Sequence, residues 1–77
     1  AFEIEQYVQE WLGELSAKHR WVIERRFGLN DTEVATLEEL AEHLGVTRER
    51  VRQIQLEGLQ TLRRVLRRQG IAKDGLL

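Results

Sequence analysis

The chain has 77 residues, a formal net charge of −1 and neither cysteine nor methionine, and 42% of its residues are hydrophobic against 32% charged. This composition is typical of one small globular domain and excludes disulfides and thiolate metal sites. Because no apolar run approaches a membrane span and no signal-peptide pattern opens the chain, we expect a cytoplasmic protein with no membrane partner. The sequence starts at Ala1 and lacks methionine, so we expect either a processed chain or, in preference, a piece of a longer protein.

The charge is unevenly distributed along the chain. Residues 1–46 contain ten acidic and four basic residues, a net of −6, whereas residues 47–77 contain eight basic and three acidic residues, a net of +5. Such a distribution favours a molecule that directs one basic face at phosphates. A solvated charged helix is the alternative, and it accounts for the arginines of residues 63–68 better than for residues 48–53.

Apolar residues at helical spacing predict a first helix. They follow the i, i+3, i+4, i+7 pattern and are Ile4, Tyr7, Val8, Trp11, Leu12 and Leu15. A second helix is predicted over residues 17–27, with Ser16 as its N-cap and Val22, Ile23 and Phe27 on its apolar side.

Gly28 suits the left-handed position that ends a helix. A loop is expected over residues 29–35, because Asn30 and Asp31 favour a turn.

A short third helix is predicted to start at Leu37. Thr36 and Glu39 form a capping box, in which each side chain bonds the backbone amide of the other residue. The inner residues of this helix are Leu37, Leu40, Ala41 and Leu44. Gly45 ends it in a turn that permits positive φ, and Val46 is expected to fill the corner.

Thr47 is expected to cap a longer helix that continues to Gly70. The two helices across the turn have the spacing of a helix-turn-helix over about residues 37–55. We therefore predict an all-α fold, a small helical bundle of the helix-turn-helix, winged-helix-like class. It forms a single domain over residues 1–77, of which residues 70–77 are expected to fray.

The start of the longer helix has two contrasting faces. At about 100° per residue, Val51, Ile54 and Gly58 fall on one side, where the two larger residues would pack on the third helix. The opposite side carries Arg48, Glu49, Arg52 and Gln53. Arginine, glutamate and glutamine are side chains that bond guanine, cytosine and adenine edges in the major groove. We interpret this segment as a recognition helix, with a generic helical hairpin as the alternative.

Three runs of residues resemble region four of bacterial RNA polymerase sigma factors. They are Arg-Phe-Gly-Leu at 26–29, Thr-Leu-Glu-Glu-Leu at 36–40 and Val-Thr-Arg-Glu-Arg-Val-Arg-Gln-Ile at 46–54. The match covers roughly residues 10–68, and the third run is highly specific to primary and primary-like sigma factors. Residues 55–59 and 69–71 resemble the stationary-phase, general stress branch more than the housekeeping branch.

The resemblance implies a domain that binds the minus-thirty-five promoter element in transcription initiation and catalyses no reaction itself. It implies base contacts by Arg48, Glu49 and Gln53. The implied phosphate contacts are Lys18, Arg26, Thr36, Leu37 through its backbone amide, Thr47, Arg50 and Arg52. Phosphate contacts fix the register of a protein on DNA, and base contacts specify the sequence.

Two departures from the family pattern affect this surface. Glu57 stands where the housekeeping relative has a basic residue, and Gln60 and Thr61 follow in place of further basic residues. Part of the surface that activators contact in that relative is therefore altered. Lys18 replaces an arginine and gives up bidentate phosphate geometry for a point charge.

The resemblance also implies protein partners, namely RNA polymerase core and an anti-sigma factor or activator. The flap of the polymerase β subunit would dock on an apolar surface of the first two helices and the C-terminal helix, and the chain would be nucleoid-associated when bound to polymerase. Trp21 and Leu56 are candidate contacts for a protein partner. The alternative is that both are ordinary apolar residues that are partly exposed to solvent.

An interaction module that binds the flap or a regulator, with little DNA binding of its own, is a second hypothesis. The third hypothesis is the output domain of a response regulator, for which we would expect a different sequence in the recognition helix. The sequence contains no catalytic constellation, no metal-ligand spacing and no cofactor motif. His19 and His43 are expected at the surface, and Ser16 is expected to be a cap rather than a nucleophile.

Overall fold

The structure is a computed structural model that describes the backbone of residues 2–68 and the side chains of residues 7–68. This part contains four helices and no strand: α1 (Phe2–Gly13), α2 (Ala17–Phe27), α3 (Leu37–Leu44) and α4 (Arg48–Arg68). The predicted all-α fold is confirmed. The expectations for the side chain of Ile4, for the helix end at Gly70 and for residues 70–77 lie outside the described residues.

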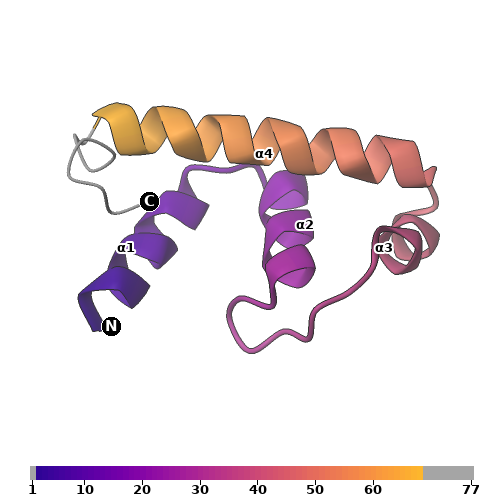
Figure 1. Ribbon diagram of the computed structural model, residues 1–77, viewed down its shortest axis with the longest axis horizontal. Coiled ribbons are helices and arrows are strands. Elements are labelled where there is room, and N and C mark those ends of the chain that lie inside the picture. Colours follow the sequence, from indigo (N-terminus) through magenta and orange to yellow (C-terminus); the bar gives the residue numbers. More distant parts are fainter. Residues whose placement is uncertain (1, 69–77) are drawn as a thin grey trace.

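The long helix α4 is the element on which the other three pack (Figure 1). α1 lies beside its C-terminal half, α2 beside its middle and α3 at its N-terminal end. α3 and the start of α4 therefore form the predicted helix-turn-helix, and α2 packs against both of these helices.

The N-termini of α2, α3 and α4 are capped as predicted. The Ser16 hydroxyl accepts a hydrogen bond from the His19 amide at the start of α2. The capping box before α3 is complete, because Thr36 Oγ1 accepts from the Glu39 amide and Glu39 Oε1 accepts from the Thr36 amide. Thr47 Oγ1 accepts from the amide of residue 50 at the start of α4. Each side chain satisfies a backbone donor that a helix start leaves free.

Two glycines end helices in the left-handed conformation, as predicted. Gly28 has φ 67° after α2, and Gly45 has φ 69° after α3. The turn expected in the loop is present, since Asn30 and Asp31 also have positive φ values of 54° and 62°. The left-handed turn at Gly45 sets the direction in which α4 leaves α3.

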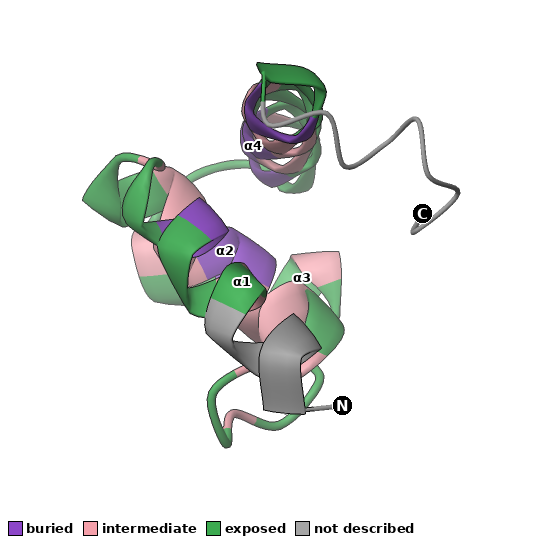
Figure 2. Ribbon diagram, turned by 90° about the vertical axis from the view of Figure 1, so that its left-hand side faces the viewer, coloured by how far each residue is buried: buried purple, intermediate pink, exposed green. Residues whose placement is uncertain are grey.

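The core has two clusters along α4. The first joins α2, α3 and α4 through the buried residues Val22, Leu40, Ala41, Val51 and Ile54, with Trp21, Ala35, Leu37 and Leu44 packed against them. The second joins α1 to the end of α4 through Trp11, Val65 and Leu66, with Val8 and Leu62 beside them. Figure 2 shows the buried positions of α4 on one side of the helix and exposed positions on the opposite side.

Three apolar residues are more exposed than predicted. Tyr7 is 41% exposed, and its ring stacks on Trp11 with centroids 5.8 Å apart, so it covers the core from outside. Phe27, assigned to the inner side of α2, is 48% exposed and borders a groove instead. Val46 is 40% exposed and does not fill the corner. Helical phase locates a residue on a face but does not show where that face ends.

Candidate nucleic-acid interface

The first two turns of α4 present a polar row on a buried support. Arg48, Glu49 and Gln53 are exposed, as predicted for base-contacting residues. On the opposite side of the same turns, Val51 is 0% exposed and Ile54 is 1% exposed. The packing of these two residues holds the helix in place, so the polar row is presented by a rigid element rather than by a loop.

Two of these residues are held by ion pairs. Nε of Arg48 pairs with Oε1 of Glu38 on α3, and Nη2 of Arg52 lies 2.6 Å from Oε2 of Glu49. The hydrogen bond from Arg52 holds the pKa of Glu49 below its ordinary value. Glu49 is therefore charged at neutral pH and acts as an acceptor. All four side chains are about half exposed or more, and such pairs exchange readily for other partners.

The start of α3 offers backbone amides next to carboxylates. Leu37 is the first residue of the helix, and its amide has no partner within the helix. Bonds from the Thr36 amide and hydroxyl lower the pKa of Glu39. A bond from the backbone amide of Glu38, and then the charge of Arg48, lower the pKa of Glu38. The ionised carboxylates of Glu38 and Glu39 therefore already interact with the positive, N-terminal end of the α3 helix dipole.

Three further predicted phosphate contacts lie on α2 or at the start of α4. Thr47 is exposed immediately before α4, and Arg50 is half-buried, with its Nη1 3.8 Å from Oε2 of Glu57 on the same helix. Lys18 is exposed on α2. The charges of Arg50 and Lys18 both help to hold the pKa of Glu57 below its ordinary value, after the hydrogen bond from His19.

Arg26 is placed differently from the other predicted contacts. It is half-buried, its Nη1 donates to the carbonyl of Ala35 at 3.1 Å, and its Nε is buried without a hydrogen-bond partner. The Ala35 amide in turn donates to the carbonyl of Arg25 at 2.9 Å. Arg26 therefore fixes the end of the loop against α2, immediately before the capping box of α3.

The two candidate partner residues have different surroundings. Trp21 is half-buried. Its ring stacks on that of His43, with centroids 4.9 Å apart, and the guanidinium of Arg25 lies 4.5 Å from the centroid of the Trp21 ring. Leu56 is 43% exposed on α4, beyond the polar row. Sequence reasoning missed the stack, because its members come from two helices whose relative position only the fold shows.

Sequence reasoning also missed the bridge between His19 and Glu57. These residues are 38 positions apart, and Nε2 of His19 lies 2.8 Å from Oε1 of Glu57. The signal for it was the unusual acid at position 57 of a basic segment. His19 is half-buried rather than fully at the surface as expected.

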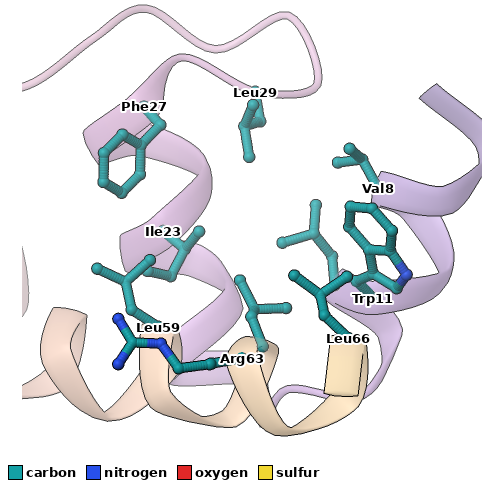
Figure 3. A pocket seen from close by; sticks show the side chains of 10 residues that line it. Val8, Trp11, Ile23, Phe27, Leu29, Leu59, Arg63 and Leu66 are labelled. Carbon is teal, nitrogen blue, oxygen red and sulfur yellow. The ribbon is translucent and has the colours of Figure 1, made fainter. Parts of the chain in front are cut away.

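Figure 3 shows an apolar groove, none of whose lining residues belongs to the polar row. It has a volume of about 420 Å³ and lies between α1, α2 and the second half of α4. Its lining residues are Val8, Trp11, Leu12, Ile23, Phe27, Leu29, Leu59, Leu62, Arg63 and Leu66. Among these described residues, Arg63 alone carries a charge, so the groove suits an apolar segment with an acidic group at one edge.

No helix within the described range could cross a membrane. The same residues contain no cluster of three or more histidine, aspartate or glutamate side chains that could hold a metal ion.

The family model described as sigma-70, region 4 matches residues 11–64, a stretch that contains α2, α3 and most of α4.

Three relatives show the extent of the likeness. The RNA polymerase sigma factor RpoS of Coxiella burnetii is 44% identical over 72 residues, which are 94% of this chain and 20% of that protein. Sigma factor SigA4 of Synechococcus elongatus is 41% identical over 58 residues, 75% of this chain and 19% of that protein. The principal sigma factor HrdC of Streptomyces coelicolor is 41% identical over 56 residues, 73% of this chain and 16% of that protein. The chain thus spans about a fifth of the length of these relatives.

Proposed function

Because the chain belongs to the sigma-70 region 4 family, we propose that it binds the minus-thirty-five element of bacterial promoters and so helps direct RNA polymerase to them. The observation that carries the proposal is the exposed row of Arg48, Glu49 and Gln53 on the first two turns of α4, whose opposite side is buried at Val51 and Ile54. The major groove admits an α-helix, and these three side-chain types discriminate between base pairs there. The role is binding, with no chemical step assigned to this chain.

The ion pairs of the free protein are compatible with this role. Arg48 would leave Glu38 and form two hydrogen bonds to a guanine. The exchange is favourable because an exposed ion pair is weak, whereas a bidentate arginine–guanine contact is worth about 1–3 kcal/mol of discrimination. Arg52 would keep Glu49 oriented toward a cytosine amine while its remaining donors face a phosphate.

The phosphate contacts would surround this row. The proposed residues are Thr47 immediately before α4, Arg50 and Arg52 on α4, Thr36 and the Leu37 amide at the start of α3, and Lys18 and Arg26 on α2. Arg26 has the weakest support as a direct contact, because its guanidinium already bonds the Ala35 carbonyl. Its main contribution would be to position the start of α3.

The experiment is a comparison of DNA affinities by fluorescence anisotropy, on a duplex with the minus-thirty-five element and on a scrambled duplex. Arg48→Ala should cost about 1–3 kcal/mol on the matched duplex and reduce the preference for it. Lys18→Ala should lower the affinity for both duplexes by the same factor. Arg67→Ala removes the same charge at the far end of α4 and serves as the control. It should change the affinity for the matched duplex, and the preference for it, much less than Arg48→Ala does. Equal losses on both duplexes for Arg48→Ala would refute the proposal.

A second function is supported by the apolar groove, namely docking of the flap of the polymerase β subunit. The groove lies between α1, α2 and the end of α4, which is the surface expected for the flap from the sequence resemblance. It is separate from the polar row, so one molecule can hold DNA and polymerase together. An anti-sigma protein that occupied the groove would compete with the flap.

This second function is tested with a peptide of the flap and two variants of exposed apolar residues. Phe27 lines the groove and is 48% exposed, whereas Val34 is 68% exposed and does not line it. Phe27→Ala should weaken peptide binding about tenfold, as the loss of a central apolar contact does. Val34→Ala should leave it unchanged. If the peptide binds both variants and the parent equally, the groove is not its site.

A further inference from the structure

A bridge between α2 and α4 lies beside the proposed phosphate contacts. Nε2 of His19 lies 2.8 Å from Oε1 of Glu57, and Nδ1 of His19 is hydrogen-bonded to the Ser16 hydroxyl. Gly58 allows the two helices to approach, because a Cβ there would lie 3.0 Å from Ile23 and 3.7 Å from Cβ of His19. The His19 side chain is 23% exposed and the Glu57 side chain is 51% exposed. The carboxylate thus reaches solvent while the imidazole is largely sheltered.

Glu57 also faces two cations that are proposed to bind the DNA backbone. Its Oε2 lies 3.8 Å from Nη1 of Arg50 on α4, and Lys18 acts on it from α2. The hydrogen bond with His19, followed by the charges of Arg50, His19 and Lys18, holds the pKa of Glu57 below its ordinary value of 4.5. At neutral pH a negative charge therefore lies where a phosphate bound to Arg50 and Lys18 would approach.

We propose that His19 and Glu57 couple binding of the DNA backbone to the uptake of a proton by the His19 ring, which makes both residues determinants of DNA affinity. The inference rests on the proposed phosphate contacts of Lys18 and Arg50. A phosphate held by these cations is repelled by the Glu57 carboxylate, and it draws Arg50 away from that carboxylate. A protonated His19 ring carries a positive charge, so it can replace Arg50 as the partner of Glu57.

The hydrogen bonds of His19 accommodate both protonation states of the ring. In the neutral ring, Nε2–H donates to Glu57 and Nδ1 accepts from the Ser16 hydroxyl. In the charged ring, Nε2–H still donates to Glu57, and Nδ1–H donates to the Ser16 oxygen. Proton uptake requires only a rotation of the Ser16 hydroxyl, so the packing of α2 on α4 is retained.

A purely structural bridge would make a different prediction. If the pair only fastened α2 to α4, pH would change the stability of the fold and leave DNA affinity unchanged. Coupling predicts a change in affinity itself. The change is equal for matched and scrambled duplexes, because phosphate contacts carry no direct sequence information.

The test is the affinity of the parent chain for both duplexes at low salt, measured from about pH 8 to about pH 5.5. Affinity should rise about two- to fivefold as the pH falls, the size expected of one exposed charge pair, and by the same factor on both duplexes. Calorimetry in buffers of different ionisation enthalpy should show net proton uptake on binding. The ratio of the two affinities tests the promoter-reading proposal separately, and the pH slope tests this inference.

Three variants decide the outcome. His19→Gln keeps a donor for Glu57 but takes up no proton, so its pH profile should be flat. His43→Gln replaces the chain's other histidine and should keep the parent profile. Glu57→Gln removes the repelling charge and should raise affinity about two- to fivefold near pH 8. A His19→Gln profile parallel to the parent profile, or an unchanged affinity of Glu57→Gln at high pH, would overturn the inference.

Discussion

The two halves of α4 are held in different ways. The first half is enclosed by α2 and α3, so that Val51 and Ile54 are almost fully buried. The second half packs on α1 through Trp11, Val65 and Leu66, and an open apolar groove remains beside it. Complete packing suits side chains that must be held in one position, whereas incomplete packing suits a partner that fills the groove.

The charged groups follow the same division. The carboxylates whose pKa values are lowered in the described part of the chain all lie on α3 or on the first half of α4: Glu38, Glu39, Glu49 and Glu57. Each accepts a hydrogen bond from a backbone amide, an arginine or a histidine. The first half of α4 therefore combines a rigid support with a network of oriented charges, and the second half offers mainly apolar contact.

The largest expected effect compares the packing of the two halves. Ile54 is 1% exposed and contacts α2 and α3 residues, whereas Leu62 is only half-buried beside the groove. Ile54→Ala should reduce the free energy of unfolding by about 2–4 kcal/mol, because it leaves a cavity in a closed core. Leu62→Ala should cost about 1 kcal/mol, since part of its surface is already in water. Urea unfolding monitored by circular dichroism measures both free energies. Equal losses for the two variants would contradict the difference in packing between the two halves of α4.

The second prediction concerns the point where α2 passes the middle of α4. A Cβ on Gly58 would lie 3.0 Å from Cγ1 of Ile23 and 3.3 Å from its Cδ1. Gly58→Ala should therefore lower stability by about 1–2 kcal/mol, because overpacking outweighs the gain of about 1 kcal/mol in helix propensity. Gly13→Ala is the control, since nothing lies within 4 Å of a Cβ there. A stabilised Gly58→Ala variant would show that the two helices separate easily at this point.

Local features of the fold were predictable from the sequence because they depend on neighbouring residues. The caps at Ser16, Thr36 and Thr47 and the left-handed glycines at 28 and 45 involve groups within a few residues of one another. The two faces of α4 were predictable for the same reason, because helical phase alone separates Val51 from its polar neighbours.

Features that join distant segments were not predictable in this way. The pair of Arg48 with Glu38 and the bridge of His19 with Glu57 require the angle between two helices, which depends on packing in three dimensions. The exposure of Phe27 has a similar origin. Its helical phase matches that of Ile23, but α1 and α4 do not close over the last turn of α2, so Phe27 borders the groove.

The third prediction compares the caps of α3 and α2. Thr36 takes part in two reciprocal hydrogen bonds of 2.9 and 3.1 Å, whereas Ser16 accepts one from the His19 amide at 3.3 Å and shares its hydroxyl with the His19 ring. Thr36→Ala should cost about 1 kcal/mol and Ser16→Ala about 0.5 kcal/mol. Thermal unfolding gives both values. A larger loss for Ser16→Ala would mean that α2 depends more on its cap than α3 does.

The smallest effect is the acid sensitivity of the capping box. Bonds from the Thr36 amide and hydroxyl lower the pKa of Glu39 from its ordinary value of 4.5. A carboxylate whose pKa is lowered by folding stabilises the fold above its ordinary pKa, and this stabilisation is lost as the pH falls through the lower, folded-state value. The free energy of unfolding should therefore decline below about pH 4.5, with a shallower decline in Glu39→Gln, which keeps an acceptor without the charge. An NMR titration of the Glu39 carboxyl that reports a pKa at or above 4.5 would contradict this assignment. In that case, the order at the start of α3 would come from packing against the first core cluster rather than from the charge of its cap.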